Sequence, residues 1–241
     1  MFYSEELINA YVPQTIVAEY TTYGQRILEL YIAGIYEIKC VGAGGLSTGI
    51  YSGDSAYGGW TGFQVSTGGC GGYVSTEVFL KPDKYIITVG ALGGGTDLTS
   101  TTYSGVKTPG SSQGSSTTST YIQNSAGDVL VVAGGGGESS YGYSGNQKND
   151  GARYVYTAGG AGGGYSVNVT PNWNTTAQNG EGSAISTGGD WSTSASRNAT
   201  YNGYGKPNNV SGSYGGYYNV SYTVSGGTGG YFRLKYLRSN A

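Results

Sequence analysis

The chain has 241 residues, of which 47 are glycine, and its 12 basic and 14 acidic residues give a formal net charge of −2. Charged residues make up only 11% of the sequence, which argues against a nucleic-acid binder with a basic face and a polybasic membrane-surface protein. The absence of histidine removes the Ser-His-Asp triad and imidazole metal sites, and two cysteines are too few for a structural zinc site within one chain.

The N-terminal residues differ in character from the rest of the chain. Residues 1–13 carry two adjacent acids and end at Pro13, and we expect them to form a separate arm. Residues 14–241 are expected to form a single domain. The arm lacks the basic and apolar regions of a secretory signal, and no apolar run approaches the length of a membrane span. We therefore expect a soluble product made in a cytoplasm.

Short segments rich in β-branched and aromatic residues predict strands along this domain. In chain order they are residues 15–20, 27–32, 35–41, 73–80, 85–89, 120–123, 129–133, 220–224 and 231–237. The turn at residues 81–84, with Pro82 at its second position, predicts a hairpin between its flanking strands. Residues 124–128 predict another hairpin. Many short strands separated by turns indicate an all-β fold, an antiparallel sandwich.

Glycine is concentrated in clusters at the strand ends and in the long excursions between strands. The clusters lie at residues 42–45, 68–72, 93–95, 134–137, 159–164 and 226–230. Such composition is compatible with disordered linkers, whereas collagen is disfavoured because no strict Gly-X-Y period exists. A third possibility is a bundle of extended polyglycine II helices, which have three residues per turn and bond to their neighbours. We favour the bundle because ordered hairpins alternate with the clusters.

The two cysteines have two interpretations. Cys40 lies in a predicted apolar strand, which favours a buried small hydrophobic side chain over a reactive thiol. A Cys40–Cys70 disulfide is less favoured and stays open, because pairing cannot be deduced from sequence.

The order of strands and glycine clusters resembles a known family. The matching series is residues 36–45, 72–90, 128–137, 158–164 and 229–237. It resembles the glycine-rich domain of bacterial and phage fibre proteins, and it is similar to the extracellular glycine-rich region of the anaplastic lymphoma kinase receptor. The resemblance covers roughly residues 15–237. It implies a jelly-roll sandwich similar to tumour necrosis factor, with a bundle of polyglycine II helices inserted between its strands.

The same resemblance implies a function. In the phage members it implies trimeric fibres or adhesin tips. The chain departs from the receptor in lacking a signal peptide, a membrane span, a kinase and many cysteines, so receptor signalling is not carried over. It also departs from long fibre proteins, because it has no repeated shaft and no large docking domain.

We therefore expect a non-enzymatic structural protein of a bacteriophage virion: a short fibre, a fibre tip or a capsid decoration. It would assemble in the host cytoplasm as a homotrimer, without a cofactor. Its expected partners are virion capsid or tail proteins and a glycan or protein on the host surface, with no nucleic acid and no membrane. Two alternatives remain, a secreted or cell-surface binding module and a tailspike-like glycoside hydrolase.

Two groups of residues are candidates for binding. Aromatic side chains in the Ser/Thr/Asn-rich excursions suit a recognition surface or, alternatively, cover the polyglycine segments. The candidates for ligand binding are Trp173, Trp191, Tyr201, Tyr204, Tyr214 and Tyr217. Apolar residues of the N-terminal arm either dock to the virion or pack on their own sandwich. These are Phe2, Tyr3, Leu7, Ile8 and Tyr11.

Catalytic chemistry has weaker support. A glycosidase needs two carboxylates across a cleft, and no pair stands out among the loop acids. These acids include Asp54, Asp97, Asp150, Glu181 and Asp190. A phosphate-binding loop is also disfavoured, since Gly205-Lys206-Pro207 has a proline where the hydroxyl residue should stand.

Overall fold

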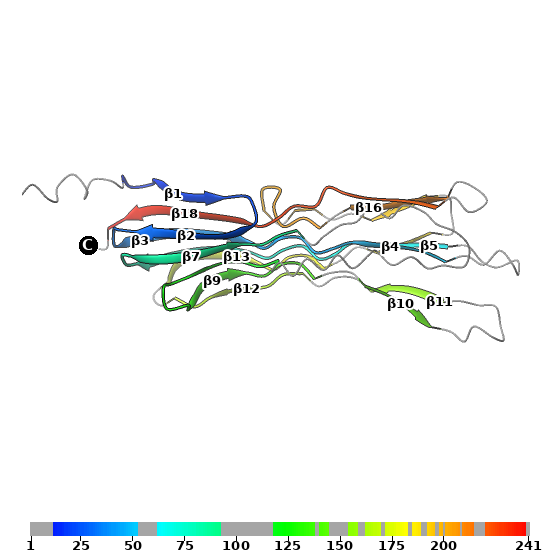
Figure 1. Ribbon diagram of the computed structural model, residues 1–241, viewed down its shortest axis with the longest axis horizontal. Helices are drawn as coiled ribbons and strands as arrows, with labels where there is room; N and C mark the ends of the chain where they lie inside the picture. The colour runs from blue at the N-terminus through cyan, green and yellow to red at the C-terminus, as the bar shows by residue number, and fades with distance from the viewer. Residues whose placement is uncertain are drawn as a thin grey trace, which may run out of the picture.

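The computed structural model is elongated and built from strands (Figure 1). It describes residues 12–52, 62–92, 118–137, 140–144, 154–158, 162–169, 172–182, 185–188, 192–195, 198–199, 201–207, 209–214 and 220–239. Within these residues every assigned element is a strand, and all the strand pairs are antiparallel. The prediction of an all-β antiparallel fold is confirmed. Residues 1–11, with all the arm candidates for docking, lie outside the described residues.

Two five-stranded sheets form the wider end of the molecule (Figure 1). The first sheet has the order β1 (Ile16–Tyr20), β18 (Tyr231–Arg238), β3 (Gly34–Val41), β6 (Tyr73–Leu80) and β13 (Asn172–Gln178). The second sheet has the order β12 (Tyr165–Val167), β9 (Val129–Ala133), β8 (Thr120–Gln123), β7 (Asp83–Val89) and β2 (Gly24–Leu30). The first and last strands of the chain, β1 and β18, are neighbours in the first sheet.

The apolar core lies between these two sheets. Strand β3 shows the pattern, because Tyr36, Ile38 and Cys40 are fully buried while Glu37 and Lys39 face outward. This period of two places alternate side chains on opposite faces of the sheet. The first sheet contributes Tyr36, Ile38, Cys40, Val74, Val78, Phe232 and Leu234, and the second Leu30, Tyr85, Ile87, Val89, Ile122, Val131 and Ala133. The predicted strands thus supply the core.

One predicted hairpin is wrong and another is confirmed. Strands β6 and β7 were expected to pair, but β6 pairs with β3 and β13, whereas β7 pairs with β2 and β8. The connection at Lys81 and Pro82 therefore carries the chain across the core from one sheet to the other. Strands β8 and β9 do form the expected hairpin, and Gly127 in its turn has a φ of 89°.

Glycine-rich segments continue from the sheets along the long axis of the molecule. We call the described segments 42–47, 67–72, 134–137, 162–164, 179–182, 205–207 and 226–230 the glycine bundle. Each of them lies beside others, because their backbone groups bond to one another. The N–H groups of Gly42 and Gly45 both donate to segment 67–72, at 2.9 Å each. Between them, Ala43 donates to Thr118 and Gly44 donates to Thr228.

The next segment repeats this arrangement. Gly69 and Gly72 both donate to segment 134–137, while Cys70 donates to Glu181 and Gly71 to Gly205. In both segments, N–H groups three residues apart donate to the same neighbouring segment. This differs from a β-strand, in which hydrogen bonds lie on two sides and the period is two.

Close backbone approach explains why glycine is required in the bundle. A Cβ placed on Gly136 would collide with the carbonyl oxygen of Gly69, and one on Gly42 would collide with that of Gly134. Larger residues are accepted only at particular positions. Among them, Ala43 and Cys70 are buried and fit within the bundle.

The far end of the molecule holds three small sheets, which we call the distal sheets (Figure 1). They comprise β14 (Ile185–Gly188), β5 (Gly62–Ser66) and β4 (Thr48–Ser52); β15 (Ser192–Ala195), β16 (Asn209–Tyr214) and β17 (Val220–Ser225); and the pair β10 (Ser140–Ser144) and β11 (Tyr154–Ala158). Strand β4 follows segment 42–47 directly, and β17 leads into segment 226–230. The glycine bundle thus joins the sandwich to the distal sheets.

The cysteines are both free and buried. Cys40 lies in the sandwich core and Cys70 in the glycine bundle, where its Sγ donates to the backbone oxygen of Asn198 at 3.1 Å. Burial raises the pKa of the Cys40 thiol well above its ordinary range. The interpretation of Cys40 as a small hydrophobic residue is therefore supported, and the alternative disulfide is absent.

Candidate binding surface

A short hairpin lies at the junction of the sandwich and the glycine bundle. Tyr201 and Tyr204 exchange two backbone hydrogen bonds, at 2.7 and 3.3 Å. The two residues between them, Asn202 and Gly203, have φ angles of 43° and 88°. Positive φ at both central residues is the requirement of a type I′ turn, and Asn-Gly is the dipeptide best suited to it.

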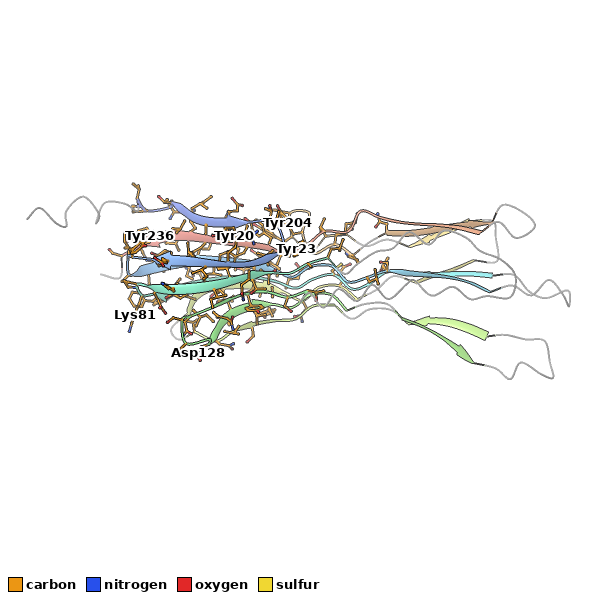
Figure 2. The ribbon with its side chains drawn as sticks, viewed as in Figure 1. Tyr20, Tyr23, Lys81, Asp128, Tyr204 and Tyr236 are labelled. Atoms are coloured by element: carbon orange, nitrogen blue, oxygen red, sulfur yellow. The ribbon has the colours of Figure 1, made fainter. Side chains whose placement is uncertain are left out.

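The rings of this hairpin pack against the first sheet. Tyr201 stacks on Tyr73 with ring centroids 4.4 Å apart and planes 7° from parallel. Tyr204 stacks on Tyr231 at 4.7 Å and 27°. Tyr73 and Tyr231 are the first residues of β6 and β18, and each follows a glycine of the bundle. Figure 2 shows Tyr204 at the end of the sandwich that adjoins the bundle, far from Lys81 at the other end.

Charged side chains lie next to these rings on the outer face of the first sheet. Arg233 donates to Glu37 at 2.6 Å, and Lys39 lies 3.6 Å from the other oxygen of that carboxylate. The Lys39 ammonium also lies 5.8 Å from the centre of the Tyr201 ring. These side chains are only 17–24% exposed, so the ion pairs are partly shielded from solvent.

Tyr231 connects the rings to a carboxylate. Its hydroxyl donates to Glu19 at 2.7 Å. Burial, together with this hydrogen bond to Glu19, raises the pKa of the Tyr231 phenol far above its ordinary value. The phenol therefore stays protonated and keeps donating. We call Tyr73, Tyr201, Tyr204 and Tyr231 the tyrosine cluster; stacking and hydrogen bonding are the chemistry that it offers.

The predicted aromatic candidates fall in separate places. Trp173 lies opposite Glu77 in β13, the edge strand of the first sheet, and is half-buried. Tyr201 and Tyr204 form the junction hairpin, and Tyr214 ends β16 in the distal sheets. Trp191 and Tyr217 lie outside the described residues. Among the described candidates, only Tyr201 and Tyr204 are brought together, and their rings stack on Tyr73 and Tyr231 of the sandwich. Their role in ligand binding stays a prediction.

The edge strand near Trp173 is irregular. The register between β13 and β6 shifts between Trp173 and Thr176, and Asn174 has a φ of 40°. The Asn174 amide donates to Glu77 at 2.7 Å, and Arg238 donates to the other oxygen of this carboxylate at 3.1 Å. A bulge at a sheet edge twists the strand and interrupts its ladder.

Of the acids considered for hydrolysis, one lies within the described residues. Glu181 is exposed at the end of a bundle segment, and Asp54, Asp97, Asp150 and Asp190 lie outside the described residues. Over the part of the chain that is described, no three metal-ligating side chains gather into a cation site. The described residues also contain no helix that could cross a membrane.

Sequence reasoning missed two members of the tyrosine cluster. Tyr73 and Tyr231 were expected only as strand residues. The sequence Tyr201-Asn202-Gly203-Tyr204 does predict the hairpin itself, because Asn-Gly between two aromatic residues favours a tight turn with both rings on one side. The position of that hairpin over β6 and β18 depends on contacts between separate segments, and the β6 partner Tyr73 lies more than a hundred residues before the hairpin, which local sequence does not reveal.

Comparisons with known proteins add no relative. The chain matches no protein-family model, and no similar curated protein or solved structure was found.

Proposed function

We propose that this chain is a non-enzymatic structural protein of a bacteriophage virion, a short fibre, fibre tip or capsid decoration that binds a glycan or protein on the host surface. The observation that carries the proposal is that the two ends of the elongated molecule differ in structure. Both ends of the described chain, Val12 and Ser239, belong to the sandwich end, and the distal sheets lie at the opposite end (Figure 1). Such a molecule can attach at one end and bind at the other.

The sandwich is proposed to be a jelly roll of the tumour necrosis factor type. Two antiparallel sheets of five strands each support this assignment. So does the placement of consecutive strands in opposite sheets, as for β6 and β7. In this fold some connections cross from one sheet to the other, which closes the sandwich around a single core.

The glycine bundle is proposed to consist of polyglycine II helices. The three-residue period of the donors in segments 42–45 and 69–72 supports this assignment. The close approach at Gly42 and Gly136 also supports it, since only glycine allows extended segments to bond to neighbours on three sides. A bundle of this kind gives a stiff spacer because every segment is tied to several others.

The binding end is proposed to be the distal end. Connections between distal strands hold residues 53–61, 145–153, 189–191 and 215–219, and their sequences include Trp60, Trp191 and Tyr217. Loops on a rigid scaffold are the usual carriers of recognition, and aromatic residues suit contacts with sugars and proteins. The N-terminal arm, beside the sandwich in sequence, is proposed to dock to virion capsid or tail proteins.

The experiment that tests this function is labelling of particles. Antibodies against the purified full-length chain, coupled to gold, would be applied to phage particles from cells that express the gene, and a pre-immune serum is the control. Gold at fibres or on the capsid is the expected result. Chain found only in the particle-free fraction, with unlabelled particles, would overturn the virion assignment in favour of a secreted module. Release of reducing sugar from host polysaccharide would overturn the non-enzymatic assignment.

A further inference from the structure

The sequence contains two Asn-Gly dipeptides, Asn179-Gly180 and Asn202-Gly203, and the structure places them in different surroundings. An asparagine followed by glycine readily loses ammonia, because glycine has no Cβ to keep its backbone nitrogen away from the asparagine side chain. Both asparagines are exposed to solvent. The two dipeptides therefore differ in how their glycine nitrogens are held, and not in the access of water to the asparagine.

Gly180 is held within the glycine bundle. Its N–H donates to the carbonyl oxygen of Gly163 at 2.8 Å, and a Cβ placed on it would collide with the carbonyl of Cys70. A peptide nitrogen attacks a carbonyl carbon only after it loses its proton, so this hydrogen bond must break first. The close packing also opposes the backbone rotation that brings the nitrogen onto the Asn179 side chain. Attack at this dipeptide therefore requires local opening of the bundle.

The glycine nitrogen of the junction hairpin is not held in this way. Asn202 and Gly203 are both exposed, and neither the Asn202 side chain nor the Gly203 N–H bonds to another described residue. A Cβ on Gly203 would meet nothing within 4 Å. The hydrogen bonds of the hairpin are made by Tyr201 and Tyr204 at its two ends, so no described contact fixes the nitrogen between them.

We propose that Asn202 is a site of spontaneous deamidation that alters the tyrosine cluster as the molecule ages, while the bundle protects Asn179. The Gly203 nitrogen forms a bond to Asn202 Cγ, the Cγ–Nδ2 bond breaks, and ammonia leaves with the proton that the nitrogen gave up. Water then opens the resulting cyclic imide. Opening at Cγ gives aspartate, and opening at the Asn202 backbone carbonyl gives isoaspartate. Nothing is oxidised or reduced.

Both products change the junction hairpin. Each replaces a neutral amide with a carboxylate, which adds one negative charge to a chain whose formal net charge is −2. Isoaspartate also lengthens the main chain between Tyr201 and Tyr204 by one methylene. The two backbone hydrogen bonds of these tyrosines, at 2.7 and 3.3 Å, depend on a two-residue turn. Loss of that turn separates the stacked rings of the tyrosine cluster.

The test follows both asparagines in one sample of the full-length chain, incubated at mildly alkaline pH and analysed by peptide mapping with mass spectrometry. We expect Asn202 to be converted at least about tenfold faster than Asn179, because an opening cost of about 1.4 kcal/mol already slows the protected site tenfold. In guanidinium chloride the two rates should be similar, since neither glycine nitrogen is then held. The control variant is Asn202→Gly, which suits the positive φ of the turn and has no amide to lose.

A second measurement follows the hairpin itself. The fraction with isoaspartate at position 202, separated by ion exchange through its added charge, should have a lower Tm than the unmodified fraction of the same incubation. Incubated Asn202→Gly should keep the Tm of its fresh sample.

Three results would overturn the inference. They are equal or faster conversion of Asn179 in the folded chain, conversion of Asn202 only in guanidinium chloride, and an isoaspartate fraction whose Tm is unchanged. None of these rates depends on whether the chain lies on virions, so the proposed function is tested separately.

Discussion

The sandwich and the glycine bundle solve the same problem in different ways. Both must satisfy buried backbone groups, and both contain fully buried residues such as Ile38 in β3 and Ala43 in the bundle. The sandwich pairs its backbone in ladders and gains stability from large side chains packed between two sheets. The bundle has almost no side chains to bury, so its segments bond to several neighbours through the backbone.

This difference explains a composition that would otherwise suggest disorder. Glycine loses the most conformational freedom on folding, so glycine segments order only when many contacts hold them. Each bundle segment is anchored by strands: segment 42–47 follows β3, and segment 67–72 leads into β6. The sandwich therefore aligns the ends of the bundle, and a change in either region tests how far one depends on the other.

Removing a large core side chain should have the largest effect. Phe232 is fully buried in β18 and stacks on Tyr20 with ring centroids 6.1 Å apart. We expect Phe232→Ala to lower the free energy of unfolding by about 4 kcal/mol, because it removes apolar contacts and leaves a cavity. Urea unfolding measures this loss. Ile16→Ala, at an exposed position, is the control and should change stability by about 0.5 kcal/mol or less. Equal losses in the two variants would contradict the account of the core.

Adding one methyl group inside the bundle should cost nearly as much. A Cβ on Gly136 would meet the carbonyl of Gly69, and neither backbone can move without breaking other bonds. We expect Gly136→Ala to destabilise the chain by about 3 kcal/mol, as overpacking does. The matched variant is Gly164→Ala, where a Cβ would meet nothing within 4 Å. That variant should be neutral or about 0.5 kcal/mol more stable. If Gly164→Ala were less stable than Gly136→Ala, the result would contradict close packing of the bundle.

The tyrosine cluster lies at the boundary between the sandwich and the bundle, and its contribution to stability can be measured there. Tyr201→Ala removes the stacking on Tyr73 and should cost about 1 kcal/mol beyond the lost burial. A double-mutant cycle with Tyr73→Ala isolates that coupling between the rings. If the two losses are simply additive, the hairpin does not hold the junction in the way described.

A pH measurement addresses a small contact at the other end of the sandwich. The hydroxyl of Ser125, in the β8–β9 turn, and the backbone N–H of Lys84 donate to Asp83 and lower the pKa of that carboxyl below its ordinary 3.8. A lowered folded-state pKa gives stability that is present above pH 3.8 and is lost as the pH falls through the folded-state pKa. We therefore expect Asp83→Asn to have a slightly lower Tm than wild type near pH 7. The difference should vanish in strong acid, and a difference that persists there would contradict the contact.

The sequence predicted the sandwich better than the distal sheets, for a physical reason. Strands such as β3 and β18 alternate apolar and polar residues because one face lies on a core. Strands β15 (Ser192–Ala195) and β14 (Ile185–Gly188) are composed mainly of Ser, Thr and Gly and show no such alternation. Their pairing depends on segments brought together by the bundle, so no local pattern identifies them.

The hairpin expected between β6 and β7 shows a second limit. The predicted turn at residues 81–84 is shorter in the structure, since Asp83 and Lys84 already belong to β7, and the connection it makes runs between the two sheets. The choice between pairing within one sheet and crossing between sheets is made by β2 and β3, which take up the partner edges of β7 and β6. The tyrosine cluster was limited in the same way, since its hairpin was readable from Asn202-Gly203 and its stacking partners were not.

The most direct test of the whole account is amide hydrogen exchange in the glycine bundle, measured by NMR on the intact chain. The amides of Gly42, Gly45, Gly69 and Gly72 donate to neighbouring segments, whereas exposed turn amides such as that of Ala126 provide an unprotected reference. We predict protection in the bundle close to that of Ile38 in the core strand β3. Exchange of the four glycine amides at the rate of an unstructured peptide would contradict the bundle and the stiff connection that it provides.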